Sequence, residues 1–176
     1  MRALGIQQPW AYTILPTGLV VAGVGGQVEG PKCIENRTWG EGFVGPLLVL
    51  ASRSLSRDTK DLRAWFAEYL PEFVLPAKGT YPTGCIVGAV YVATTTRSSG
   101  HAMSSTGRPG GGADQAKFCD CLAGTVYWAM KDKVVFERPI PWRGELKLFD
   151  VPLRVVEDQL AGWKWLGVAR EREGMR

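Results

Sequence analysis

The pattern of apolar and polar positions along this 176-residue chain predicts short strands with few helices. The segment "GPLLVLAS" (45–52) is a continuous apolar run of strand length, which is typical of a strand buried on both faces. The segment "TGCIVGAVYVATT" (83–95) is rich in β-branched residues, which favour strands. Further strands are predicted at residues 2–6, 32–39, 126–142 (as one strand or two) and 144–151.

The clearest helical pattern lies at residues 57–70. Apolar residues recur there every three or four positions and so form one stripe along the predicted helix. Ser56 can cap its N-terminus, and Pro71 ends it. A short helix is expected from Pro9, a residue favoured in the first turn, and another after Val155.

The domain organisation follows from length and from one segment of unusual composition. Residues 95–118 are dense in Ser, Gly and Thr and lack an apolar period, so they predict a long flexible insertion. A chain of this length suits one domain. We therefore expect a domain at 1–155 that contains the insertion, followed at 156–176 by a short helix and a charged, frayed tail.

Composition and charge narrow the class of protein. Apolar residues make up 45% of the chain and charged residues 22%, which excludes a disordered chain. The formal net charge of +4 is compatible with an anionic partner. No apolar run reaches the roughly 18 residues of a membrane helix, and "MRALGIQQPW" does not resemble a signal peptide. We expect a cytoplasmic protein that does not bind membranes.

The segment "GPKCIENRTW" (30–39) carries two cations and one anion, Lys32, Glu35 and Arg37, within six positions. In a strand, Glu35 and Arg37 point to the same side, so the carboxylate can hold the guanidinium in place. The planar fork of Arg suits a phosphate or a base edge, and Lys32 adds a positive charge just before the strand. The alternative is a surface ion pair, which would stabilise the fold by only about 0–1 kcal/mol.

The same segment carries a family signature. Gly30, Lys32, Glu35 and Arg37 fill every fixed position of Gly-x-Lys-x-x-Glu-x-Arg. The segments "QPW", "GPLLVLAS", "TGCIVGAVYV", "YWAM" and "PIPWRGELKLFDV" accompany it in order. In these features the chain resembles the ASCH domain family, a branch of the PUA-like superfamily, over about residues 3–152. The resemblance implies an α+β fold, a PUA-like mixed β-barrel of about six strands decorated by two or three helices.

The resemblance also implies a function. Family members are thought to bind RNA, other single-stranded nucleic acid, or a nucleotide or modified base in a cleft lined by the signature. Some relatives are ribonucleases or hydrolyse acylated cytidine, so the alternative is a metal-independent ribonuclease or acylated-nucleoside amidohydrolase with Lys32 and Glu35 as catalytic residues. Whether the protein is an enzyme stays open. A second alternative, which the modest charge permits, is a protein-interaction module.

Further binding residues are predicted from their chemistry and position. Gln8 can read a base edge, and Trp10 can either stack on a base or pack in the core. Ser52 and Arg53 end a buried strand, where cleft rims lie, and Tyr127 alternates with a neighbouring Trp along a late strand. The predicted nucleic-acid or nucleotide site therefore comprises Lys32, Glu35, Arg37, Gln8, Trp10, Ser52, Arg53 and Tyr127.

The residues that bind metals form no recognisable motif. Cys119 and Cys121 lack a second paired knuckle, and His101 is the only histidine of the chain. The single histidine also excludes a ribonuclease that works with a pair of histidines. We expect no metal and no other cofactor, and we expect a monomer.

Overall fold

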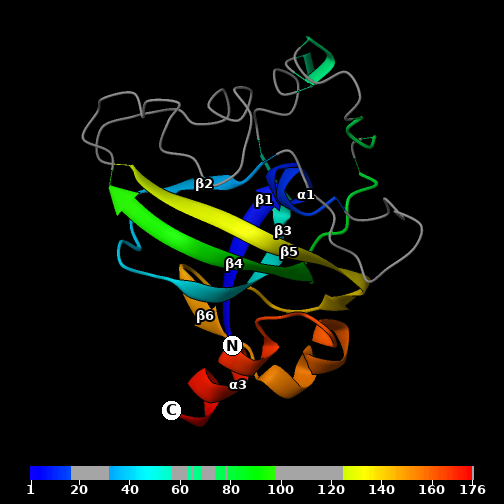
Figure 1. Cartoon of the computed structure of the whole chain (residues 1–176). Coiled ribbons are helices and arrows are strands. Elements are labelled where there is room, and N and C mark those ends of the chain that lie inside the picture. The colour runs from blue at the N-terminus through cyan, green and yellow to red at the C-terminus, as the bar shows by residue number, and fades with distance from the viewer. Residues whose placement is uncertain are drawn as a thin grey trace.

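The described part of the chain forms a mixed sheet of six strands with few helices (Figure 1). The computed structural model describes residues 1–16, 32–56, 63–64, 66–68, 74–77, 79–97 and 125–175. The strands are β1 (Arg2–Gln8), β2 (Ile34–Arg37), β3 (Gly45–Leu55), β4 (Cys85–Arg97), β5 (Val126–Pro141) and β6 (Leu148–Asp150). The helices are α1 (Trp10–Ile14), the 3-10 turns η2 (Leu153–Val155) and η3 (Glu157–Leu160), and α3 (Leu166–Gly174).

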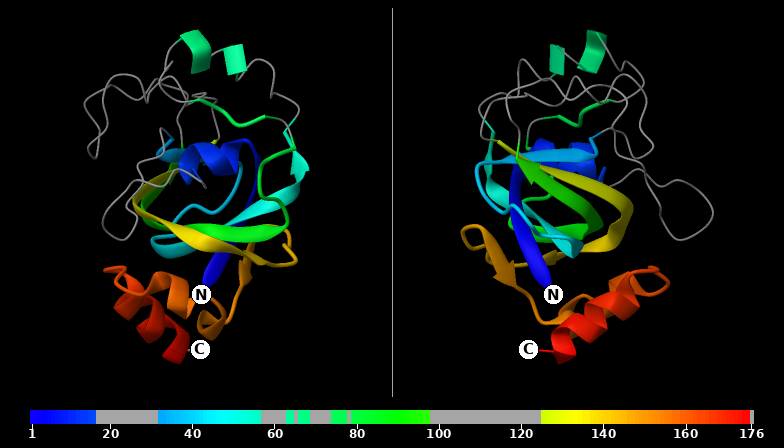
Figure 2. Two further views of the ribbon diagram at one scale, coloured as in Figure 1. Left: turned by 90° about the vertical axis from the view of Figure 1, so that its right-hand side faces the viewer. Right: turned by 60° about the vertical axis from the view of Figure 1, so that its left-hand side comes forward.

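The order of the strands in the sheet is β2-β5-β4-β3-β1-β6. Strands β1 and β3 run parallel, and the other neighbouring pairs run antiparallel. Among the described strands, the edge strands β2 and β6 each pair with one neighbour only. The sheet is therefore not closed, and the expectation of a β-barrel is corrected to a strongly curved, open sheet (Figure 2).

A side chain bridges two strands that would be close in a closed barrel. Arg37, at the end of β2, donates a hydrogen bond of 2.9 Å from Nη2 to the main-chain oxygen of Gly5 in β1. These two strands lie at the first and fifth positions of the sheet order. Strand β2 is only four residues long, and the chain turns at Gly40, whose φ is 88°. The strand thus ends before it can form a hydrogen-bonded ladder with β1.

Helix α1 covers one face of the sheet. Ile14 from this helix is fully buried in a core with Leu4, Val49, Val87 and Trp128, each from a different strand. The helix is short because Pro9 precedes it and Pro16 follows it closely. This core lies beneath the segment that contains Lys32 and Glu35.

The C-terminal segment covers the opposite face (Figure 2). Leu160 and Trp163 pack there with Ala3, Leu50 and Ile86 of three neighbouring strands. Because alternate residues of a strand point to opposite faces, Leu50 and its neighbour Val49 belong to different cores. No described helix has the length and apolarity that a membrane span requires.

Most predicted elements are confirmed, with changed boundaries. The segment 126–142 forms one strand, β5, and β4 continues through Arg97, so residues 95–97 belong to the sheet and not to a loop. Only 148–150 of the strand predicted at 144–151 is extended. The charged C-terminal segment is helical through Gly174, where we expected a frayed tail. Of the helix predicted at 57–70, residues 63–64 and 66–68 are helical and the others lie outside the described residues, as do 98–118.

Candidate nucleic-acid interface

Lys32, Glu35 and Arg37 form a continuous chain of ion pairs. Nζ of Lys32 lies 2.6 Å from Oε2 of Glu35, and Nη2 of Arg37 lies 3.0 Å from Oε1 of the same carboxylate. The alternation of a strand places Glu35 and Arg37 on the same side of β2, as the sequence predicts. One carboxylate thus holds two cations, so the three residues do meet in space. Gly30, the first residue of the signature, lies outside the described residues.

The three side chains differ in their exposure. The side chains of Lys32 and Glu35 are 6% and 8% exposed, whereas that of Arg37 is 24% exposed. Glu35 pairs across the sheet with Trp128, a fully buried residue of the core that α1 covers. The two charges of an ion pair buried this deeply depend on each other, because removal of either partner leaves an uncompensated charge in the interior. Arg37 is the most exposed member of the group.

Lys32 is fixed between helix α1 and the sheet. Its ammonium lies 4.5 Å from the centre of the Trp10 ring, a cation–π contact. Its main-chain N–H donates a 3.0 Å hydrogen bond to the oxygen of Thr13 in α1. One face of Trp10 is therefore covered by a side chain of the protein itself. The prediction that Trp10 stacks on a base remains untested, but this face is not open to a ligand.

The side-chain amide of Gln8 forms hydrogen bonds to the main chain through both its nitrogen and its oxygen. Nε2 donates to the oxygen of Pro82 at 3.0 Å, and Oε1 accepts from the N–H of Tyr12 at 3.0 Å. The residue is 1% exposed. These bonds position the start of α1 on the loop before β4, and they would have to break before Gln8 could read a base.

A cleft of about 1450 Å³ opens beside Arg37. Ser52 and Arg53 of β3 line it, so the structure brings together Arg37 and these two predicted residues. Tyr127 does not belong to this group: it pairs with Asn36 and so lies on the other face of β2 and β5. Among the residues that the structure describes, the lining is Leu4, Gly5, Arg37, Trp39, Leu50, Ser52, Arg53, Ser54, Gly84, Pro141, Trp142, Arg143, Gly144, Glu145, Leu146 and Lys147.

Comparison with solved structures identifies the fold. The crystal structure of the ASCH protein of Zymomonas mobilis matches with a TM-score of 0.51 and 11% identity, covering 92% of this chain and 94% of that chain. A single-residue variant of the same protein matches with a TM-score of 0.50 and 11% identity, covering 92% and 96%. The chain has the ASCH fold. No family model and no curated protein matches the sequence.

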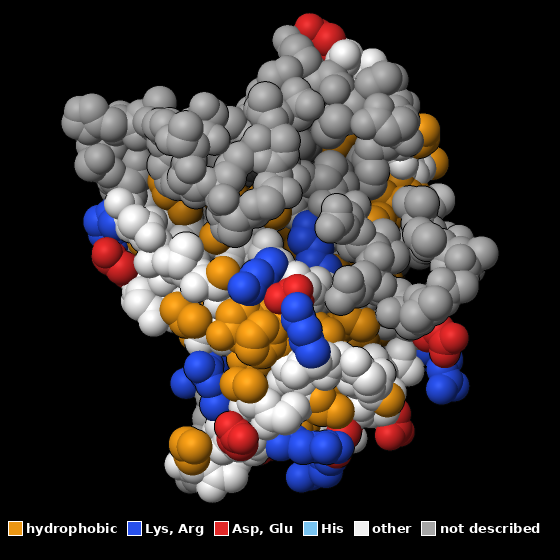
Figure 3. Space-filling model, viewed as in Figure 1, with side chains coloured by type: hydrophobic (Ala, Val, Ile, Leu, Met, Phe, Trp, Pro, Cys, Tyr) orange, Lys and Arg blue, Asp and Glu red, His pale blue; other side chains and the backbone are white. Residues whose placement is uncertain are grey.

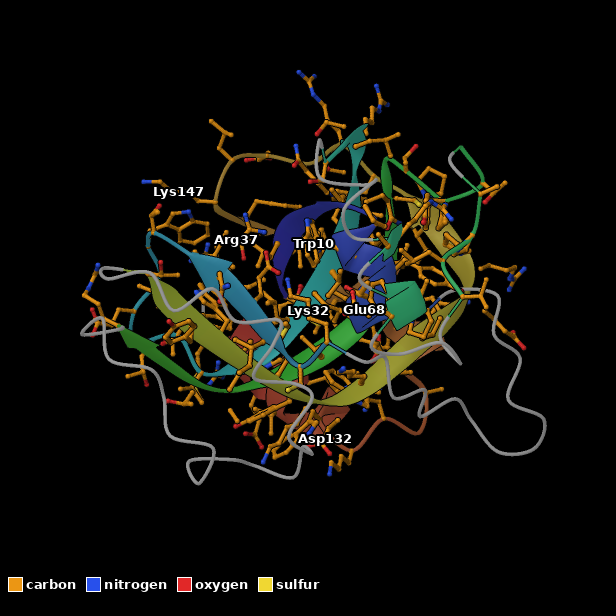
Figure 4. The ribbon with its side chains drawn as sticks, turned by 90° about the horizontal axis from the view of Figure 1, so that it is seen from above. Trp10, Lys32, Arg37, Glu68, Asp132 and Lys147 are labelled. Atoms are coloured by element: carbon orange, nitrogen blue, oxygen red, sulfur yellow. The ribbon has the colours of Figure 1, made fainter. Side chains whose placement is uncertain are left out.

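Within this ASCH fold, several cleft residues escaped the sequence analysis. Trp39 follows β2, and Trp142, Arg143 and Lys147 belong to the segment between β5 and β6. The sequence "PWRGELK" does combine an indole with cations, but most of it lay within the strands predicted at 126–142 and 144–151. Figure 4 shows Arg37 between Lys147 on one side and Lys32 on the other. Because the segment is not extended before residue 148, it forms a wall of the cleft instead of a sheet edge.

The charges of the cleft are one-sided. Of the described residues that line it, Arg37, Arg53, Arg143 and Lys147 are cations and one, Glu145, is a carboxylate. On the face shown in Figure 3, by contrast, basic and acidic side chains of the described residues are intermixed. Among the residues that the structure describes, no three His, Cys, Asp or Glu side chains meet closely enough to hold a metal ion. The cleft thus offers cations and indoles to a ligand.

Proposed function

We propose that this protein binds single-stranded nucleic acid or a nucleotide in the cleft beside Arg37. The observation that carries the proposal is the guanidinium of Arg37, which Glu35 and the oxygen of Gly5 hold in one orientation at the edge of the cleft. A guanidinium in a fixed orientation binds a phosphate or a base edge at little further cost in entropy. Its orientation therefore favours a planar or anionic ligand.

The other cations of the cleft support an anionic ligand. Arg53, Arg143 and Lys147 are exposed side chains from β3 and from the segment between β5 and β6. Exposed cations that face one cleft raise the local concentration of phosphate and accelerate its association. The serine hydroxyls of Ser52 and Ser54 lie in the same lining and can donate to phosphate oxygens.

A metal-independent hydrolase is the second candidate, because Lys32 and Glu35 form a buried ammonium–carboxylate pair at 2.6 Å behind Arg37. A carboxylate in such a place can handle a proton during attack of water on an acyl or phosphoryl group. Both side chains are at most 8% exposed, so neighbouring groups would have to move before a substrate could reach them.

The proposal is tested by binding and turnover measured separately. Purified protein is titrated with labelled single-stranded RNA, single-stranded DNA and a panel of modified nucleosides, and products are analysed by chromatography. Arg37→Ala should weaken binding, and Arg37→Lys should restore part of the affinity, because Lys keeps the charge and loses the fork. Affinity should fall with salt, with a slope of roughly −0.7 per phosphate contact on single strands.

Arg138→Ala is the matched control, since Arg138 is an exposed arginine of β5 that does not line the cleft. It lowers the net charge by the same amount as Arg37→Ala. Equal losses of affinity in both variants would indicate general electrostatic attraction and would contradict a site at Arg37. Absence of binding to every ligand in the panel would overturn the proposal.

A further inference from the structure

Two tryptophans that follow different strands line the same cleft. Trp39 lies two residues after Arg37, and Trp142 follows β5 directly. Both are half-buried, so part of each indole is accessible from the cleft. Indole faces in a cleft of cations are the combination by which proteins hold unpaired bases, because stacking serves the base and the cations serve the backbone.

Both indoles are held in place by the fold. Trp39 packs edge-on against Trp128, with ring centres 5.7 Å apart and an angle of 77°, and its main-chain oxygen accepts from the indole N–H of Trp128 at 3.3 Å. The main-chain N–H of Trp142 donates a 3.0 Å hydrogen bond to the oxygen of Gly84, and its ring packs against the core that the C-terminal segment covers. Fixed aromatic rings lose little entropy when a ligand stacks on them.

The cations of the cleft lie close to these indoles in the sequence. Arg143 directly follows Trp142, and Arg37 precedes Trp39 by two residues. The cleft of about 1450 Å³ is larger than the roughly 300–1,000 Å³ of pockets that hold one small ligand. Two indoles, four cations and this volume suit a ligand with several bases joined by phosphates.

We infer that Trp39 and Trp142 are base-stacking positions, so that the cleft receives a nucleic-acid strand with unpaired bases in preference to a free nucleotide. The inference rests on the proposed function and specifies its ligand. It also moves the stacking role from Trp10, one face of which is covered by Lys32, to two residues that line the cleft.

Two oligomers with the same phosphates separate stacking from charge. The first is a fluorescein-labelled oligothymidylate of about eight nucleotides, within the range that such clefts hold. The second has the same length and only abasic sites. Trp142→Leu should weaken binding of the oligothymidylate about 5- to 150-fold and leave the abasic oligomer unchanged, whereas Trp142→Phe, which keeps an aromatic face, should retain most of the affinity. Trp39→Leu and Trp39→Phe should behave in the same way.

A spectroscopic measurement on the protein without a Leu substitution tests stacking even if the Leu variants do not fold. Protein labelled with 5-fluorotryptophan gives one fluorine signal for each of its seven tryptophans, and Trp142→Phe assigns one of them. The Trp142 signal should shift on titration with the oligothymidylate and stay in place with the abasic oligomer. A signal that responds equally to both oligomers, or to neither, would overturn stacking.

The outcomes distinguish this inference from the proposed function. If Trp142→Leu has no effect, or weakens both oligomers equally, while Arg37→Ala still weakens binding, the stacking positions are wrong and the proposed function stands. Thymidine monophosphate that binds as tightly as the oligothymidylate would overturn the preference for a strand. If the unchanged protein binds neither oligomer nor any nucleotide, the proposed function fails and the inference fails with it.

Discussion

The ammonium of Lys133 in β5 donates a 2.6 Å hydrogen bond to the main-chain oxygen of Lys32, and both side chains are buried. Lys32 lies just before β2 begins, so its carbonyl group is outside the ladder of the sheet and needs a donor from elsewhere. With its N–H bound to Thr13 of α1, the main chain of Lys32 is fixed on both sides. Lys133 thereby positions the ammonium that pairs with Glu35.

Lys133→Met should disturb the site through Lys32. Loss of the donor leaves a buried carbonyl group without this bond, so the free energy of unfolding should fall by about 1–3 kcal/mol. The ε-methylene protons of Lys32 should also lose the ring-current shift that the nearby Trp10 ring produces, as measured by NMR. Lys133→Arg, which keeps a charged donor, should restore part of both.

Lys131→Met is the matched control, because Lys131 is an exposed lysine of the same strand. It should leave the Lys32 signals and the affinity for oligonucleotides nearly unchanged. An unchanged Lys32 signal in the Lys133→Met protein would contradict the positioning role.

Glu35→Gln distinguishes a receptor from a hydrolase. The substitution keeps the shape of the side chain and removes the charge between Lys32 and Arg37, so the free energy of unfolding should fall by about 3–5 kcal/mol. A receptor should retain most of its affinity for the oligonucleotide. An enzyme that uses Glu35 to handle a proton should keep its affinity and lose turnover by about 100-fold or more.

We expect the receptor outcome. Binding is measured by fluorescence anisotropy at a temperature where both proteins are folded, and products by chromatography. Product formation by the unchanged protein that disappears in Glu35→Gln, with binding intact, would establish the hydrolase instead.

Two glycines after β2 provide a matched pair for stability. Gly40 and Gly42 have the same φ of 88°, a conformation that side chains rarely adopt. A Cβ at Gly40 would lie 2.1 Å from Cζ2 of Trp128, whereas a Cβ at Gly42 would meet no atom within 4 Å. Gly42→Ala should therefore cost about 1 kcal/mol of unfolding free energy from backbone strain alone. Gly40→Ala should cost roughly 1–3 kcal/mol more, because buried Trp128 must move.

Urea unfolding of both variants measures the difference. Equal losses of stability would show that Trp128 adapts without cost, and would contradict the rigid placement of the neighbouring Trp39 that the stacking inference requires.

Asp132 joins β5 to the C-terminal segment. Its carboxylate lies 2.6 Å from Nζ of Lys164 and accepts a 3.1 Å hydrogen bond from the indole N–H of Trp165. Its main-chain oxygen accepts from the indole N–H of Trp163 at 2.9 Å. One residue thus holds three consecutive residues of the segment that covers the second core.

The stability that Asp132 contributes should depend on pH. Burial alone raises its pKa, but the hydrogen bonds from Lys164 and Trp165 and the charge of Lys164 outweigh burial and lower the pKa below its usual value. The folded state therefore favours the charged form, and the contribution is fully present above the unfolded pKa of about 3.8. It is lost as the pH falls through the lower pKa of the folded state.

Asp132→Asn tests this dependence. The variant should be less stable than the unchanged protein near neutral pH, and the difference should shrink as the pH falls below about 3.8, when the unchanged protein takes up the proton. Urea titrations at several pH values measure it. A difference that stays constant with pH would show that the contribution of Asp132 does not come from its charge.

The local elements of this protein follow from its sequence alone. Local patterns such as the apolar run at 45–52 and the alternation at 32–39 predicted five of the six strands nearly at their observed positions, because the burial of a strand depends on residues within it. The pairing of Glu35 with Arg37 was also predictable, since the period of two puts both on one side of β2. The exception among the strands is β6: the residues before it carry a strand-like pattern but form the cleft wall.

Contacts between distant segments were decided by the tertiary structure. Arg37 binds the main-chain oxygen of Gly5, 32 positions away, because the curved sheet brings β2 near β1 without pairing them. That curvature arises with register shifts along β4 and β5, which have no signature in the sequence. The tertiary structure also places Lys32 over Trp10 and sets Trp39 and Trp142 around one cleft. Which tryptophan meets a ligand therefore depends on how the strands bend, because an indole suits a core and a binding site equally well until its neighbours are in place.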